Sequence, residues 1–120
     1  MSNDETLHVT LHLCPAEVWN AQGTSETYLP EAYALDGFVH CTDGDEELVA
    51  VGNRFYQADP REFVVLSVDL DANGSKWIYE DPARIFPHIY GPIASTAVVG
   101  IRPVLRDEDG AFTGIGEAVS

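Results

Sequence analysis

Cysteine and long apolar runs are scarce in this chain, and each absence excludes a class of protein. There are two cysteines, Cys14 and Cys41, in separate apolar segments and without a CxxC pair. A disulfide-stapled domain or a zinc ribbon is therefore not expected. No apolar run approaches the length that spans a bilayer, and the polar start MSNDET lacks the apolar centre of a signal peptide. We expect a cytoplasmic protein.

Basic residues are also few. Six Lys and Arg stand against twenty Asp and Glu, which gives a formal net charge of -14. Such a charge repels phosphate backbones and anionic lipid, so nucleic acid and membrane surfaces are poor partners. Solubility or adaptation to salt explains the acidic excess without any special partner. A pocket could still hold Arg54, Arg84 or Arg102 against the global charge and bind a small anionic ligand.

The 120 residues, of which 45% are apolar, are enough for one domain with its own core. We divide the chain into a disordered N-terminus at 1–6, a domain at 7–105, and a C-terminal hairpin or frayed extension at 106–120. The oligomeric state has no signature in the sequence.

The first segments alternate between strand and helix patterns. LHVTLHLC predicts a strand at 7–14, with leucines on one face and His8 and His12 on the other. Pro15 then begins a short helix that ends near Gly23.

A second strand and a longer helix follow. LPEAYAL predicts a helical turn broken by Gly37, and FVHC a strand that contains His40. TDGDEELVAVGNRFY predicts a helix capped by Thr42, Asp43 or Asp45. The residues expected on its inward stripe are Leu48, Val49, Val51, Gly52 and Phe55.

The second half is rich in strand patterns. FVVLSVDL at 63–70 is nearly continuous apolar sequence, which is typical of a central strand buried on both faces. After a DANGS turn, KWIYE predicts a strand and DPARIFPH, with two prolines, a loop. STAVVGIRPVL predicts a late strand that pairs through a DEDG turn with AFTGI. The order of elements indicates an α+β domain.

Two segments, GFVHCT at 37–42 and FPHIYGP at 86–92, place histidines in apolar surroundings. An imidazole has two ring nitrogens that need partners, and burying it without them costs a few kcal/mol. His40 and His88 are therefore either satisfied by structural hydrogen bonds or held for chemistry.

Six segments resemble, in order, the domain family of unknown function numbered 952. They are HLCPAEVW at 12–19, GFVHCT at 37–42, VGNRFY at 51–56, VVLSVDL at 64–70, YEDP at 79–82 and FPHIYGPI at 86–93. The chain is identified as a member of this family. It departs from the family pattern at Thr42, where serine is common, and in DEDGAFTGIGEAVS, which extends past the usual end.

The family is similar in fold to the ADP-ribosyltransferase and RNA 2'-phosphotransferase superfamily. The resemblance implies a central, mostly antiparallel, split sheet with two or three short helices. It also implies a cleft between two small sheets that binds NAD, as a substrate, or a related nucleotide. An ADP-ribosyl- or phosphotransferase-like activity would follow, with no other cofactor expected.

The same resemblance assigns roles to residues of this chain. His12 would contact ribose hydroxyls, and His40 and Thr42 would line the middle of the cleft. Tyr90 would stack on a flat ring. Glu80 or His88 would polarise the attacking group, so the candidate catalytic residues are His40, His88 and Glu80. Asn53 and Arg54 are further candidate ligand contacts.

Each assignment has a structural alternative. His12 could be solvated on an edge strand, and His40 and His88 could bond backbone carbonyls and hold their segments in place. Asn53 and Arg54 could cap the end of their helix, and Tyr90 could be core packing with a tied hydroxyl.

Two further classes of function stay open. Histidines near a carboxylate are the ingredients of a zinc or iron site, although the spacing lacks an HxH or HExxH core. Alternatively, the domain binds a small ligand or a protein without catalysis. A transferase should bring Glu80 within reach of the cleft, whereas a purely structural domain should tie every histidine to backbone carbonyls and leave no cavity.

Overall fold

The computed structural model describes residues 8–22 and 25–117. The segment expected to be disordered, 1–6, lies outside them, as do residues 118–120 of the extension. Within the described residues, no helix is long and apolar enough to cross a membrane.

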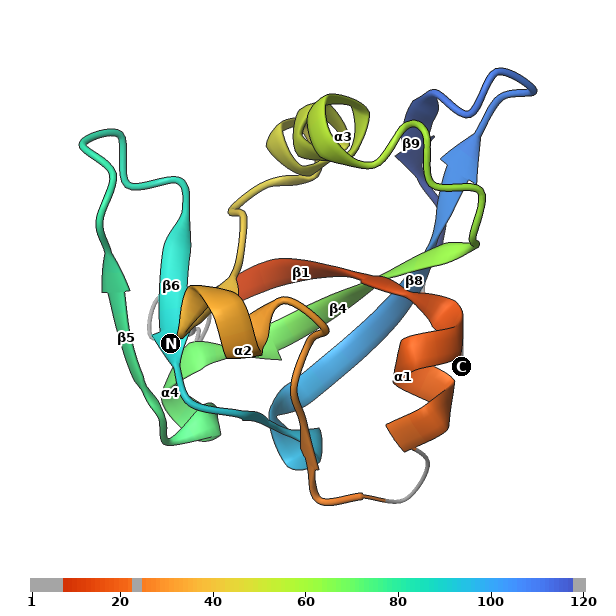
Figure 1. Ribbon diagram of the computed structural model, residues 1–120. Helices are drawn as coiled ribbons and strands as arrows, with labels where there is room; N and C mark the ends of the chain where they lie inside the picture. Colours follow the sequence, from red (N-terminus) through yellow and green to blue (C-terminus); the bar gives the residue numbers. More distant parts are fainter. Residues whose placement is uncertain (1–7, 23–24, 118–120) are drawn as a thin grey trace.

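The apolar run forms β4 (Phe63–Asp69), an inner strand of a curled four-stranded antiparallel sheet with the order β1-β4-β8-β9 (Figure 1). The other strands of this sheet are β1 (Val9–Pro15), β8 (Val98–Arg106) and β9 (Phe112–Ile115). Val65, Leu66 and Val68 are each 0% exposed, which confirms a central strand covered on both faces.

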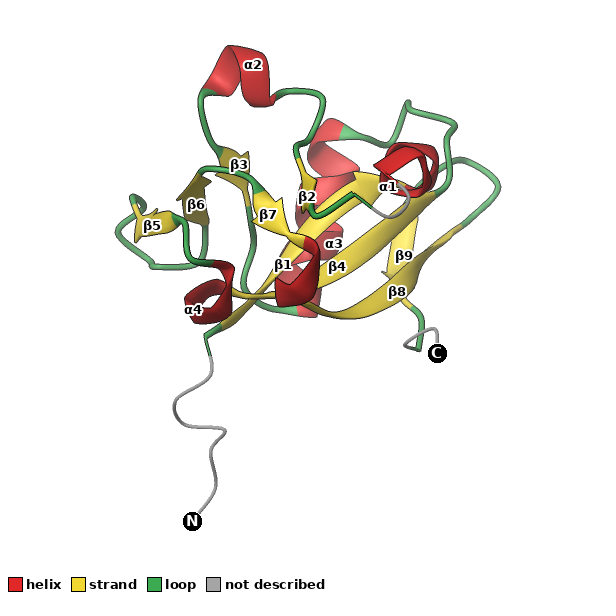
Figure 2. Cartoon of the chain, turned by 90° about the horizontal axis from the view of Figure 1, so that it is seen from below, coloured by secondary structure: helices red, strands yellow, loops and turns green. Residues whose placement is uncertain are grey.

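Two smaller antiparallel sheets lie beside the first (Figure 2). One pairs β2 (Thr27–Tyr28) with β7 (Ile93–Ala94). The other has the order β3-β6-β5 and consists of β3 (Val39–His40), β6 (Pro87–Tyr90) and β5 (Lys76–Tyr79). The strands are therefore split between sheets and antiparallel, as predicted.

The prediction of a loop at 81–88 is wrong for its last two residues, because Pro87 and His88 belong to β6. Proline is tolerated there because it is the first residue of the strand, where its missing N–H is least costly. β6 is the middle strand of its sheet, and its register with β3 pairs His88 with His40.

The described residues contain four α-helices rather than the two or three expected: α1 (Ala16–Gln22), α2 (Tyr33–Asp36), α3 (Asp45–Phe55) and α4 (Leu70–Asn73). A 3-10 turn, η2 (Ser95–Ala97), precedes β8. The additional helix is α4, which replaces the expected turn after β4. It forms because the Asp69 carboxylate accepts from the backbone N–H groups of Asp71 and Ala72 at the helix start.

Helix α3 begins differently from the prediction. Its N-cap is Gly44, with no side-chain cap, and not one of the three expected residues, Thr42, Asp43 or Asp45. The Asp43 carboxylate accepts from the hydroxyls of Thr10 and Tyr79. The predicted set of inward-facing residues is also wrong at its last member. Leu48 and Gly52 are buried, but Phe55 is 66% exposed.

Both faces of β1 are covered. Leu11 packs in one cluster with Leu48 and Val65, while Cys14, on the other face, belongs to the main core. The face that carries His12 is the more deeply buried, which overturns the solvated alternative for this residue. The reason is tertiary, because β1 and residue Thr42 exchange backbone hydrogen bonds and bring the β3 segment against the strand.

The β8–β9 hairpin packs against α3 through Phe112. A Cβ at Gly52 would lie 2.3 Å from the Phe112 ring, far inside van der Waals contact. Asn53, the next residue, donates to the Phe112 carbonyl and accepts from the Phe112 N–H. Glycine and asparagine in the GNRF segment thus hold the hairpin in place.

We expect Gly52→Ala to lower the free energy of unfolding by about 1–3 kcal/mol, because the new methyl group forces a buried ring to move. Urea unfolding monitored by circular dichroism measures this. Gly114→Ala on β9 is the matched control, since its Cβ would lie 3.8 Å from Leu105 in ordinary contact. Equal midpoints for the two variants would contradict the prediction.

Candidate functional site

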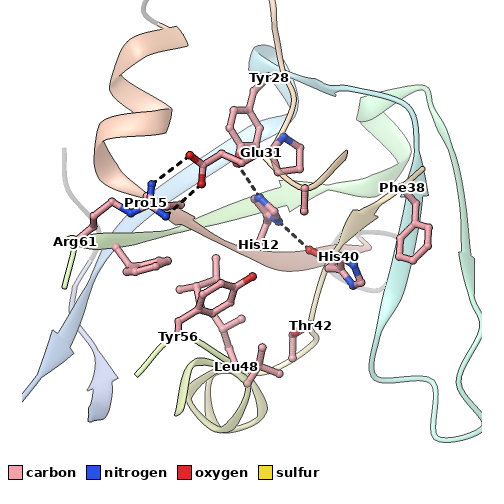
Figure 3. Close-up of a pocket in the computed structure, with 15 residues that line it drawn as sticks. His12, Pro15, Tyr28, Glu31, Phe38, His40, Thr42, Leu48, Tyr56 and Arg61 are labelled. Atoms are coloured by element: carbon pink, nitrogen blue, oxygen red, sulfur yellow. Dashed lines mark hydrogen bonds and ion pairs between the residues drawn. The ribbon is translucent and has the colours of Figure 1, made fainter. Parts of the chain in front are cut away.

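Two adjoining pockets open around the β3 segment, and Figure 3 shows the inner one. The inner pocket, about 160 Å³, lies between β1, the α2 segment and α3, and includes Leu13, Phe38, Leu48, Tyr56 and Phe63 in its lining. The outer pocket, about 520 Å³, lies between α3 and the β3–β6 pair. His40, Thr42 and Val51 line both pockets and form their common wall.

His12 lies at the base of the inner pocket and is 5% exposed (Figure 3). Its Nδ1 donates to the His40 carbonyl oxygen at 2.8 Å, because that oxygen can only accept. Nε2 is then left to accept from the Tyr28 hydroxyl at 3.0 Å. Burial lowers the pKa of His12 from 6.5 to about 4, so the imidazole is neutral near pH 7.

His40 and His88 face one another across β3 and β6. They are directly opposite in the register, and their ring centroids are 5.5 Å apart. His40 is exposed, and its Nε2 lies 2.8 Å from an oxygen of Asp36, four residues earlier on α2. Nδ1 of His88 lies 2.8 Å from Glu80. Each imidazole is therefore oriented by a carboxylate, and within the described residues neither His40 Nδ1 nor His88 Nε2 has a hydrogen-bond partner.

Glu80 binds both His88 and Tyr90. Its Oε1 accepts from the Tyr90 hydroxyl and from His88, and these hydrogen bonds lower the pKa of the Glu80 carboxyl. Phe38 stacks on the His88 ring with a centroid distance of 4.1 Å. The His88 ring is thus held in one orientation by a hydrogen bond at its edge and an aromatic face above it.

Of the other candidate residues, some line a pocket and some do not. Thr42 lines both pockets, and Arg54 lines the outer one. Tyr90 and Asn53 line neither pocket, because the Tyr90 hydroxyl is bound to Glu80 and the Asn53 amide to Phe112. The histidines and Tyr90 therefore do not converge on one cavity.

Several residues that take part in the site were missed by the sequence analysis. Asp36 had a signal, because it lies four residues before His40, although Gly37 intervenes. Tyr28 and Arg61 had none, since each reaches the inner pocket from a segment without a recognisable pattern. Arg61 pairs with Glu31 at 3.2 Å, as Figure 3 shows, and also with Asp59 at 2.8 Å and Glu17 at 3.7 Å.

The thiols are not nucleophiles in this arrangement. Cys14 and Cys41 are free and buried. Burial raises the pKa of both thiols, which keeps them protonated at neutral pH. Cys41, directly after β3, is buried, whereas its neighbour His40 is exposed.

The described residues contain no group of three or more His, Cys, Asp or Glu side chains that could hold a metal ion. The chemistry that the site can support is proton transfer by His40 and His88, because each has an oriented ring and one nitrogen directed away from its carboxylate. The outer pocket also holds three carboxylates, those of Glu47, Glu80 and Asp81.

Comparison with known proteins shows the family of this chain. Residues 13–101 match the sequence profile of a family described as protein of unknown function (DUF952). None of the curated proteins matches the chain.

The fold resembles that of CC0527 from Caulobacter crescentus. Two crystal structures of that protein, one of a double mutant, each give a TM-score of 0.72 at 21% identity, covering 88% of this chain and 94% of that chain. Its solution NMR structure gives 0.67 at 20% identity, with 85% and 89% covered. The likeness at this identity shows the fold alone.

We expect His12 to make the protein less stable in acid. Its pKa is about 4 in the folded protein, against an ordinary value of 6.5, so the unfolded chain takes up a proton over that range and the folded one does not. Stability is therefore lost as the pH falls from 6.5 to about 4, by up to about 3 kcal/mol.

Urea unfolding at several pH values, for wild type and for His12→Asn, measures this contribution. The asparagine amide can still donate to the His40 carbonyl, but it does not titrate. The difference between the two proteins should shrink toward acid pH. His8→Ala, at an exposed histidine paired with Asp71, is the control. A wild-type profile parallel to that of His12→Asn would refute the assignment.

Proposed function

This chain belongs to the DUF952 family, whose function is unknown, and we propose that it binds a nucleotide-like small molecule across the inner and outer pockets. The observation that carries the proposal is the common wall of the two pockets, where His40 faces His88 and each ring is oriented by a carboxylate. A purely structural role predicts histidines tied to backbone carbonyls, and of these three histidines only His12 is bonded in that way.

The inner pocket would hold the flat ring of the ligand. Its lining is mostly apolar and aromatic, and its volume of about 160 Å³ is close to the ~150 Å³ apolar cavities that bind benzene. Phe38 and Tyr56 offer aromatic faces to a heterocycle.

The outer pocket would hold the sugar. Ribose hydroxyls are donors, and the carboxylates of Glu47, Glu80 and Asp81 are acceptors. A ligand whose ring enters the inner pocket and whose sugar stays in the outer pocket would place its glycosidic bond at the common wall, beside His40 and Thr42. The resemblance to ADP-ribosyltransferases that we infer from the sequence favours NAD as one such ligand.

The reaction that this arrangement favours is ribosyl transfer. The bond from C1' of the ribose to the ring nitrogen breaks, and its electron pair leaves with the ring. Positive charge develops at C1', which nearby carboxylates stabilise. A water or hydroxyl then attacks C1' and gives its proton to His88, held by Glu80. Phosphotransferase chemistry is less favoured, because it develops negative charge beside the same carboxylates.

We expect NAD, ADP-ribose or nicotinamide to raise the melting temperature of the wild-type protein. A ligand that binds only the folded state adds about 2.7 kcal/mol at a hundredfold excess over its Kd. The shift should be lost in His40→Ala and His88→Ala, because both remove a side chain from the outer pocket. Differential scanning fluorimetry measures it, with zinc as an arm that tests the alternative metal site.

His8→Ala is the matched control, since it also removes a histidine paired with a carboxylate but lies outside both pockets. It should respond to ligand as wild type does. If no compound shifts wild type while both pocket variants simply melt earlier, the histidines are structural and the proposal fails. Retained binding by both variants, without turnover in wild type, would instead favour a binding domain without catalysis.

A further inference from the structure

We propose that the natural ligand of the two pockets is a nucleoside without phosphate groups, in which a six-membered heteroaromatic ring is joined to ribose. This inference rests on the proposed function and narrows it from nucleotide-like compounds to one chemical class. Two features of the site carry it, the size of the inner pocket and the distribution of charge around both pockets.

The inner pocket limits the ring. Its volume of about 160 Å³ matches one six-membered ring, by comparison with the ~150 Å³ cavities that take benzene. A purine fuses a second ring to the first and needs more space. The pocket therefore fits a pyridine or a pyrimidine.

The outer pocket repels phosphate. Its lining holds three carboxylates and the guanidinium of Arg54, so its formal charge is -2 when the imidazoles are neutral. Glu80 accepts hydrogen bonds from Tyr90 and His88, and Asp81 accepts from the backbone N–H groups of Ile85 and Phe86. These donors hold both carboxylates in their ionised form. A phosphate monoester adds about 1.5–2 negative charges to this environment at pH 7.

Arginines that would normally bind phosphate are committed elsewhere. Arg61, the arginine at the inner pocket, donates to Asp59 and Glu31. Arg102 forms a bidentate ion pair with Asp45.

The remaining arginines differ in what they contact. Arg106 donates to backbone carbonyls, those of Arg61 and Gly110 among them. The Arg84 guanidinium lies over the Tyr79 ring, 5.2 Å from its centre. Of the arginines in the described chain, Arg54 alone lines the outer pocket, and its guanidinium lies 5.4 Å from the centre of the Phe55 ring. One guanidinium does not offset three carboxylates.

The test compares ligands that differ by a single phosphate. Isothermal titration calorimetry at low salt is carried out with nicotinamide riboside and its 5'-monophosphate, and with cytidine and CMP. We expect at least one nucleoside to bind, and its monophosphate to bind about tenfold more weakly or worse. Adenosine tests ring size and should bind more weakly than either nucleoside.

Glu47→Gln tests whether the charge of the pocket causes the discrimination. It removes one carboxylate from the outer pocket and should bring the affinities of a nucleoside and its monophosphate closer by a few-fold. Glu46→Gln is the matched control. It removes the same charge from the same first turn of α3, at a residue that lines neither pocket, and should leave the ratio unchanged.

The failures of the two proposals are distinguishable. If a monophosphate or NAD binds as tightly as the nucleoside or more tightly, the inference is overturned while the proposed function stands. Adenosine binding best would overturn the ring assignment in the same way. If none of these compounds, nicotinamide and ADP-ribose included, binds the wild-type protein, both proposals fail.

Discussion

The buried imidazole of His12 joins the three sheets formed by the described residues. It belongs to β1, donates to the backbone of His40 on β3, and accepts from the Tyr28 hydroxyl on β2. A buried polar group without partners costs several kcal/mol, so these bonds strongly select one arrangement of the sheets. Burial of the ring keeps it neutral near pH 7, because it lowers the pKa of His12. The residue that the family resemblance places at a ribose therefore acts first as a structural link, at the base of the inner pocket.

The position of His40 follows from that link. Because its backbone carbonyl is held by His12, its side chain points to the other side and meets His88 across the β3–β6 pair. Phe38, Asp36 and Glu80 then restrict both rings. The site thus lies between the β3-β6-β5 sheet and α3. Hydrogen bonds from β1 connect it to the core. Its acidic lining is consistent with the acidic composition of the whole chain.

Most of the strands and helices could be predicted from local patterns. The continuous apolar run of β4, a short helix after β1 and the Gly37 end of α2 depend on residue type and spacing alone, although Pro15 ends β1 and α1 begins one residue later than expected, at Ala16. Errors arose where a distant residue decided the outcome. Asp43 does not cap α3, because its carboxylate accepts hydrogen bonds from the hydroxyls of Thr10 and Tyr79. Phe55 is exposed, because Phe112 packs on Gly52 instead. The start of β6 was not predicted, because it is a proline, Pro87, and proline normally interrupts a strand.

The candidate site shows the same division. From the sequence alone came the family, the α+β class and the interest of His12, His40, His88 and Glu80, because residue types and motifs are local properties. Tertiary structure alone decided which of them share a pocket, that Asn53 and Tyr90 line neither, and that Tyr28 and Arg61 take part. The physical reason is that pockets and hydrogen-bond partners depend on contacts between segments far apart in the chain, which no local pattern encodes.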